Sequence, residues 1–136
     1  MRLETDFLGT KEVPSEAYYG IQTIRASENF PITGQRIHPE LIRAMAMVKK
    51  GAAIANMEIR RLLSSKGDAI VLAAEEIIGG QWFDQFIVDP IQGGAGTSIN
   101  MNTNEVIANR ALEIIGKEKG SYADISPNNQ IGRAHV

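Results

Sequence analysis

A glycine-rich segment at residues 92–105, QGGAGTSINMNTNE, is the part of this sequence best suited to chemistry. Glycines let the backbone turn sharply and approach a ligand closely. Thr97 and Ser98 then suit the start of a helix, where unpaired N–H groups and the helix dipole favour an anion. On residue chemistry alone, the segment is either a small-anion site or a plain helix-capping turn.

The helix expected after this loop is unusually rich in asparagine, which lies at positions 100, 102, 104 and 109. Asparagine disfavours helix interiors because its side chain competes for backbone hydrogen bonds. Two explanations stay open: a polar helix wall that binds something small and anionic, or a helix that hydrogen-bonds to neighbouring chain. Glu105 lies in the same helix, and if buried it would need partners of its own, for a structural role or to shape a site.

Other kinds of site find little support. The loop has no lysine before its Thr–Ser pair, so it is not a Walker A loop, and it lacks the third glycine of a dinucleotide fingerprint. His38 and His135 are isolated, and His38 is expected at a helix cap or on the surface. The absence of cysteine excludes disulfides, thiolate catalysis and cysteine-based metal sites. We expect no metal and no cofactor.

Composition points to an ordinary globular domain. The chain has 136 residues, of which 43% are hydrophobic and 22% charged, enough for one domain with a core of its own. Its net charge of -2 gives no reason to expect nucleic acid or an anionic membrane as a partner. No apolar run has the length of a signal peptide or a membrane span, so we expect a cytoplasmic protein.

The elements that position the loop are predicted to be mainly α-helical, after an irregular or short-strand lead-in at residues 1–14. A first helix is expected over residues 15–29 with Ser15 as N-cap, and a long one over residues 39–64. A third is expected from Asp68 to Ile78, ended by two glycines, and a fourth from Thr97 or Ser98 to Ile115. Residues 81–91 are expected to be extended or turn-rich, and residues 117–136 polar and turn-rich.

The second of these helices has a heptad-like apolar seam: Leu41, Met45, Val48, Ala52, Ala55, Ile59 and Leu62. The seam is expected to pack within the chain, or else against a partner subunit. A chain that self-associates through this seam would be a helical interaction module rather than an enzyme. Glu75 and Glu76 are expected on a solvated face.

The order of motifs is more specific than any one of them. ETD at residues 4–6, AYYGIQTIRA at 17–26 and ENF at 28–30 precede DQF at 84–86, the glycine loop and a run ending in NEVIANRA at 104–111. This order resembles the aspartase/fumarase superfamily over about residues 3–130. The AYYG and GGAGTS forms are similar to those of aspartate ammonia-lyases. In class II fumarases, the alternative, the first of these two motifs usually has a Trp-Gly form and the second a Gly-Ser-Gly-Thr form.

The resemblance implies a reversible anti elimination in which L-aspartate gives fumarate and ammonia. A base takes the C3 proton, and donors and positive charge stabilise the dianion that forms on the C4 carboxylate. Thr97 matches the family's substrate-binding threonine, and Ser98, Asn100 and Asn102 belong to the same motif. The family forms homotetramers whose active sites each draw on three subunits, of which this chain would supply one region.

The rest of the family's machinery is missing. Its catalytic serine lies on a Gly-Ser-Ser loop that has no counterpart here, so no catalytic residue is assigned and the chain is expected to be inactive alone. Residues 125–130, ISPNNQ, resemble the start of a second substrate-site motif, so Ser126, Asn128 and Asn129 form a possible secondary anion site. We expect residues 1–130 to be the N-terminal part of a longer enzyme, and residues 131–136 to be a non-native or divergent tail.

Overall fold

The computed structural model describes residues 1–132. A hairpin of β1 (Arg2–Asp6) and β2 (Gly9–Val13) leads into four helices, α1 (Ile21–Asn29), α2 (Pro39–Glu58), α3 (Ser64–Ile78) and α4 (Thr97–Ile114). A short 3-10 turn, η1 (Phe83–Gln85), precedes the glycine loop, and a π-helical turn, η2 (Pro127–Ile131), follows α4. The predicted fold class, mainly α with a short-strand lead-in, is confirmed.

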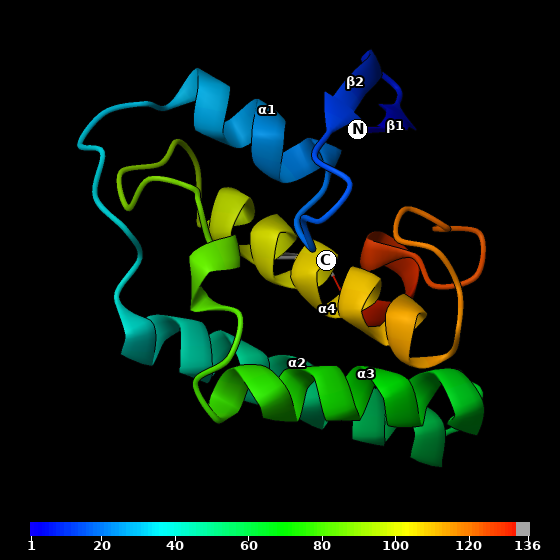
Figure 1. Ribbon diagram of the computed structural model, residues 1–136. Coiled ribbons are helices and arrows are strands. Elements are labelled where there is room, and N and C mark those ends of the chain that lie inside the picture. The colour runs from blue at the N-terminus through cyan, green and yellow to red at the C-terminus, as the bar shows by residue number, and fades with distance from the viewer. Residues whose placement is uncertain (133–136) are drawn as a thin grey trace.

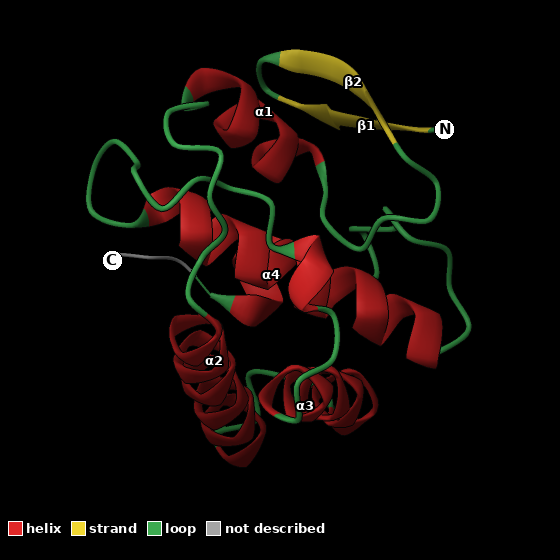
Figure 2. Cartoon of the chain, turned by 60° about the vertical axis from the view of Figure 1, so that its left-hand side comes forward, coloured by secondary structure: helices red, strands yellow, loops and turns green. Residues whose placement is uncertain are grey.

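Helix α4 is the centre of the structure (Figure 1). The hairpin and α1 lie on one side of it, and α2 and α3 on the other, an arrangement that Figure 2 shows from a second direction. From Asn102 to Asn109 every residue of α4 is buried. Because this stretch of α4 is covered on all sides, it lacks the polar outer stripe of a surface helix, and its polar side chains need partners inside the protein.

The first helix begins at Ile21 rather than at Ser15, which corrects the prediction. Four carbonyl oxygens in the preceding segment accept hydrogen bonds from the Arg2 guanidinium, at 2.8–3.2 Å, instead of entering a helical ladder. These carbonyls belong to Pro14, Ser15, Ala17 and Tyr19. A remote side chain therefore overrides the local capping signal at Ser15.

The predicted helix over residues 39–64 is wrong at its C-terminal end, since α2 ends at Glu58. Arg60 has a left-handed backbone (φ 59°), which a continuing helix does not allow. Helix α3 then begins at Ser64 with Leu63 as N-cap, so the prediction of Asp68 as N-cap is also wrong. The end of α3 at Ile78, before two glycines, is confirmed.

The predicted apolar seam of α2 is not the face that packs within the chain. Leu41, Val48 and Ile59 are exposed, and the buried residues are Ile42, Ala46, Lys49 and Ala53. These lie one position further along, about 100° around the helix. The small side chains Ala46 and Ala53 let α2 lie close to its neighbours, and α3 is the helix that it contacts most. Four of the seven seam residues are therefore exposed, whereas Leu62, which lies beyond the end of α2, is buried in the core as expected.

No helix within residues 1–132 combines the length and the hydrophobicity that crossing a membrane requires.

Candidate functional site

The glycine loop turns into α4 through two residues that need glycine. Gly94 and Gly96 have left-handed backbones (φ 78° and 85°), which side-chain-bearing residues rarely adopt. Gly96 is the N-cap of α4 but has no side chain with which to cap it. Instead, Oε1 of Gln92 accepts from the N–H of Ile99 at 3.1 Å, while its Nε2 donates to the carbonyl of Asp89 at 3.0 Å. Gln92 thus fixes the loop, a role that no local sequence pattern predicts.

Thr97 and Ser98 are the first two residues of α4. Thr97 is exposed and Ser98 is half-buried. Within residues 1–132, neither hydroxyl nor either backbone N–H has a hydrogen-bond partner. Two hydroxyls and two N–H donors therefore lie unpaired at the positive end of an 18-residue helix. This is the chemistry of a small-anion site.

Asn100, one turn further along, is buried and contacts α2. Its Oδ1 accepts from Nζ of Lys49 at 2.5 Å, and its Nδ2 has no partner in the described part of the chain. Burial lowers the pKa of Lys49. A hollow of about 290 Å³, lined by both residues together with Ala95 and Gly96, lies beside the glycine loop.

The other three asparagines hydrogen-bond to neighbouring segments. Asn102 donates to the carbonyl of Gln85 at 3.0 Å and accepts from the N–H of Val88 at 3.4 Å. Asn104 donates to the carbonyl of Gly132. The explanation that the asparagine-rich helix hydrogen-bonds to neighbouring chain is thus correct for these side chains. Because the amide of Asn102 is engaged at both ends, its role in substrate binding stays a prediction.

Asn109 joins α4 to the chain before α1 and to the loop after α4. Its Nδ2 donates to the carbonyl of Tyr18 at 2.6 Å, and its Oδ1 accepts from the N–H of Gly120 at 2.8 Å. Tyr18 is remote from Asn109 in sequence, whereas Gly120 lies in the loop after α4, and both bonds satisfy groups that burial would otherwise leave unpaired.

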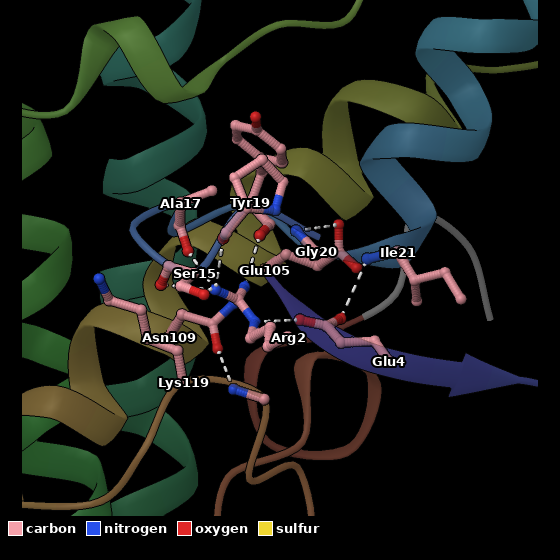
Figure 3. A network of polar contacts seen from close by, with 12 residues as sticks. Arg2, Glu4, Ser15, Ala17, Tyr19, Gly20, Ile21, Glu105, Asn109 and Lys119 are labelled. Atoms are coloured by element: carbon pink, nitrogen blue, oxygen red, sulfur yellow. Dashed lines mark hydrogen bonds and ion pairs between the residues drawn. The ribbon is translucent and has the colours of Figure 1, made fainter. Parts of the chain in front are cut away.

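Glu105 is buried in α4 and caps the N-terminus of α1 (Figure 3). Its Oε1 accepts from the N–H groups of Gly20 (3.2 Å) and Thr23 (2.9 Å) and from the Thr23 hydroxyl (2.6 Å). Its Oε2 accepts from the N–H of Gln22 at 3.0 Å. The carboxylate therefore has a clear structural role, since it satisfies three donors that a helix start leaves unpaired.

Glu4 of β1 supplies the remaining cap. Its Oε1 accepts from the N–H of Ile21 at 3.0 Å and from the Tyr122 hydroxyl at 2.9 Å, and its Oε2 accepts from Arg2 at 2.8 Å. The two carboxylates meet at Gly20, where a Cβ would lie 2.6 Å from Glu105 Oε2 and 2.7 Å from Glu4 Oε1. Burial, and secondarily the charge of Glu4, raises the pKa of Glu105 to about 7 in spite of its hydrogen bonds.

The predicted secondary anion site falls on η2 and its N-cap. Ser126 Oγ accepts from the N–H of Asn129 at 3.2 Å and caps the turn, while Asn128 and Asn129 are exposed. The turn packs against α4 near Asn104. A ligand role for these three residues stays a prediction. The predicted tail lies partly outside the described residues, which end at 132.

Two further expectations have different outcomes. His38 caps α2, as expected, because its Nδ1 accepts from the N–H of Glu40 at 3.1 Å. Glu76, however, is not on a solvated face, which corrects the prediction. It accepts from Arg110 at 2.7 and 3.0 Å and from the Trp82 indole at 2.9 Å, and these bonds tie α3 to α4 and to the N-cap of η1.

Comparison with known proteins places the chain among lyases. A family model described as "Lyase" matches residues 9–134. A structure described as a fumarate lyase:delta crystallin from Brucella melitensis superposes with a TM-score of 0.94 at 53% sequence identity, covering 96% of this chain and 30% of that one. The class II fumarase from Schistosoma mansoni superposes with a TM-score of 0.89 at 36% identity, covering 96% and 28%. The chain belongs to this lyase family.

Within the family, the chain is similar to aspartate ammonia-lyases. It is 68% identical over 131 residues to the enzyme from Bacillus sp, and 65% identical over 130 residues to that from Bacillus subtilis (strain 168). Each match covers 96% of this chain, against 28% and 27% of the relatives. The chain thus spans little more than a quarter of the length of the relatives that it matches.

Proposed function

We propose that this chain is the part of an aspartate ammonia-lyase that supplies one substrate-binding segment, in an enzyme that reversibly converts L-aspartate to fumarate and ammonia. The observation that carries the proposal is the start of α4. There Thr97 and Ser98 present donors that have no partner within residues 1–132, at the positive end of a buried helix and beside a loop that requires glycine. A carboxylate is the ligand that such donors favour.

In this role, the start of α4 holds a substrate carboxylate and stabilises the negative charge that grows on it during elimination. Donors fixed before the reaction lower the barrier because they need no reorganisation when charge develops. Gln92 and the buried asparagines provide that fixation, since they tie the loop and α4 to neighbouring segments. The base that takes the C3 proton lies outside this chain.

The alternative activity is hydration of fumarate, as in class II fumarases. The 36% identity to the Schistosoma mansoni fumarase is well below the 68% identity to an aspartate ammonia-lyase, which favours deamination. A homotetramer in the cytoplasm, with active sites shared between subunits, completes the proposal. The exposed apolar side chains of α2, such as Leu41 and Val48, support it because such surfaces are usually covered in an assembly.

A chimera tests the activity directly. Residues 3–130 of this chain would replace the matching segment of the Bacillus subtilis relative, to which the chain is 65% identical. Fumarate formation followed in the ultraviolet should occur with L-aspartate and not with L-malate. A folded, tetrameric chimera that acts on malate in preference to aspartate would refute the proposal in favour of a fumarase.

The isolated chain gives a complementary test. Because the catalytic base and the remaining carboxylate contacts are not encoded, purified chain should produce no fumarate from aspartate above background. Turnover by the chain alone would show that the site needs no further segment.

A further inference from the structure

Lys49 is a buried lysine beneath the start of α4. It is only 5% exposed, because it lies on the inner face of α2 with Ala46 and Ala53. Lysine is rarely buried without an anionic partner. Within residues 1–132, however, Lys49 forms no ion pair, and its hydrogen bond runs to the neutral amide of Asn100. Among the described residues, Lys49 thus has no counter-charge.

The surroundings make this charge more costly. Asn100 lies in the first turn of α4, where the helix dipole is already positive and a nearby cation is unfavourable. Burial alone lowers the pKa of Lys49. Side chains that conflict with their local environment in this way concentrate at functional sites, where binding compensates for the conflict.

The position of Lys49 indicates which site it serves. It lines the hollow beside Ala95 and Gly96 of the glycine loop. Its Nζ is also close to the segment after η2, because a Cβ on Gly132 would lie 3.5 Å from it. The NH2 group of Asn100, although buried, has no acceptor in the part of the chain that the structure describes. Lys49 therefore lies close both to the glycine loop and to the segment that follows η2.

We propose that Lys49 is a positioning residue of the anion site at Thr97. Its ammonium group fixes the first turn of α4 through Asn100 and adds positive charge behind the glycine loop. A small carboxylate at the start of α4 is then bound more tightly while Lys49 is charged. This inference rests on the proposed function, but it assigns Lys49 no contact with the substrate.

Few other ionisable groups face Lys49. On α2 its neighbour Lys50 pairs with Glu75 of α3 at 3.5 Å. On α4 the carboxylate of Glu105 is directed to the start of α1. Residues 92–100 and 126–132 contain no ionisable side chain. Among the described residues, Lys49 is thus the group whose deprotonation changes the charge behind the loop.

The first test needs no ligand. In the isotopically labelled chain, NMR would follow the Lys49 side chain and the Asn100 NH2 group as the pH is raised. The Asn100 resonances should shift together with the titration of Lys49, at a pH below the usual range of a lysine because burial lowers the pKa of Lys49. In Lys49→Arg they should stay at their charged-state positions throughout. Asn100 resonances that ignore the titration of Lys49 would overturn the proposal.

The second test uses fumarate as the probe and the amides of Thr97 and Ser98 as reporters. Lys49→Met should weaken fumarate binding by roughly three- to tenfold, as expected for one partly screened charge. The affinity of this variant for fumarate should no longer fall at high pH, whereas that of wild type should. Lys49→Arg should keep most of the affinity, and Lys50→Met, the matched control, should bind like wild type.

The outcomes separate the two proposals. Equal fumarate affinity and equal pH dependence in Lys49→Met and wild type would refute the role of Lys49 and leave the anion site intact. Wild-type amides of Thr97 and Ser98 that do not respond to fumarate would count against the anion site itself, and the ligand-free titration would still decide whether Lys49 controls Asn100. If Lys49→Met fails to fold, the wild-type titration and Lys49→Arg decide the question.

Discussion

The buried carboxylate of Glu105 allows a quantitative prediction for Glu105→Gln. The side chain is 1% exposed and accepts four hydrogen bonds from residues 20–23. Glutamine has nearly the same shape but no ionisable group. The substitution therefore removes the titration at this position while leaving most of the packing in place.

The sign of the effect follows from the raised pKa. Burial raises the pKa of Glu105 from 4.5 to about 7, so between these values the folded chain binds a proton that the unfolded chain has released. The stabilising contribution is complete below the unfolded pKa and is lost as the pH rises through the folded one. A shift from 4.5 to about 7 corresponds to a loss of about 3 kcal/mol in the free energy of unfolding.

Urea unfolding of wild type and Glu105→Gln at several pH values between 4.5 and 8 would measure this loss. Wild type should lose about 3 kcal/mol more than the variant over that range. Glu75→Gln, the same substitution on the exposed surface of α3, is the matched control. If the free energies of unfolding of Glu105→Gln and wild type change in parallel with pH, ionisation of Glu105 does not destabilise the folded chain. That result would refute the reasoning.

Three further predictions concern the scaffold. Gly20→Ala should destabilise the chain by about 2 kcal/mol or more in urea unfolding, because the added Cβ would overlap both buried carboxylates. Gly51→Ala should instead stabilise the chain by about 0.5–1 kcal/mol, because a Cβ at this position of α2 would meet nothing within 4 Å. Gln92→Ala should cost about 1 kcal/mol, as expected for a lost helix cap, and an unchanged midpoint would contradict that role. Light scattering should show a mass that rises with concentration for wild type and a monomer for Val48→Glu; a monomeric wild type would exclude association through α2.

The sequence predicted the helix ends that are set by residues close to them in the chain. Helix α4 begins and ends within a residue of its predicted limits because glycines at 96 and 116 mark both ends. The N-cap of α2 was predicted for a similar reason, since His38 precedes a proline. The start of α1 was not predicted, because the groups that cap it come from positions 4 and 105. No local pattern reveals such distant partners.

The face on which α2 packs was also not predictable from periodicity. The helix has apolar residues on one face and small residues on another, and a pattern cannot say which face the chain itself covers. Lys49 lies on the small face, where a charged side chain is typical of a solvent-exposed position. A lysine in register with Ala46 and Ala53 was nevertheless a signal that could have identified the buried position.

The candidate site was found from the sequence because glycine, threonine and serine occur in one short segment. Its supporting residues were not all found, since Gln92 and Lys49 act through the folded structure. The asparagines were noticed for their number, but only the structure shows that Asn102, Asn104 and Asn109 hydrogen-bond to neighbouring segments.

The most direct test of the central claim is the effect of Thr97→Ala on kcat/KM for aspartate in the Bacillus subtilis chimera. Loss of one donor to the developing negative charge should cost about 2–4 kcal/mol of transition-state stabilisation. Thr10→Ala, on the exposed hairpin, is the matched control and should leave kcat/KM unchanged. A Thr97→Ala chimera as active as its parent would contradict the claim that the start of α4 binds the substrate.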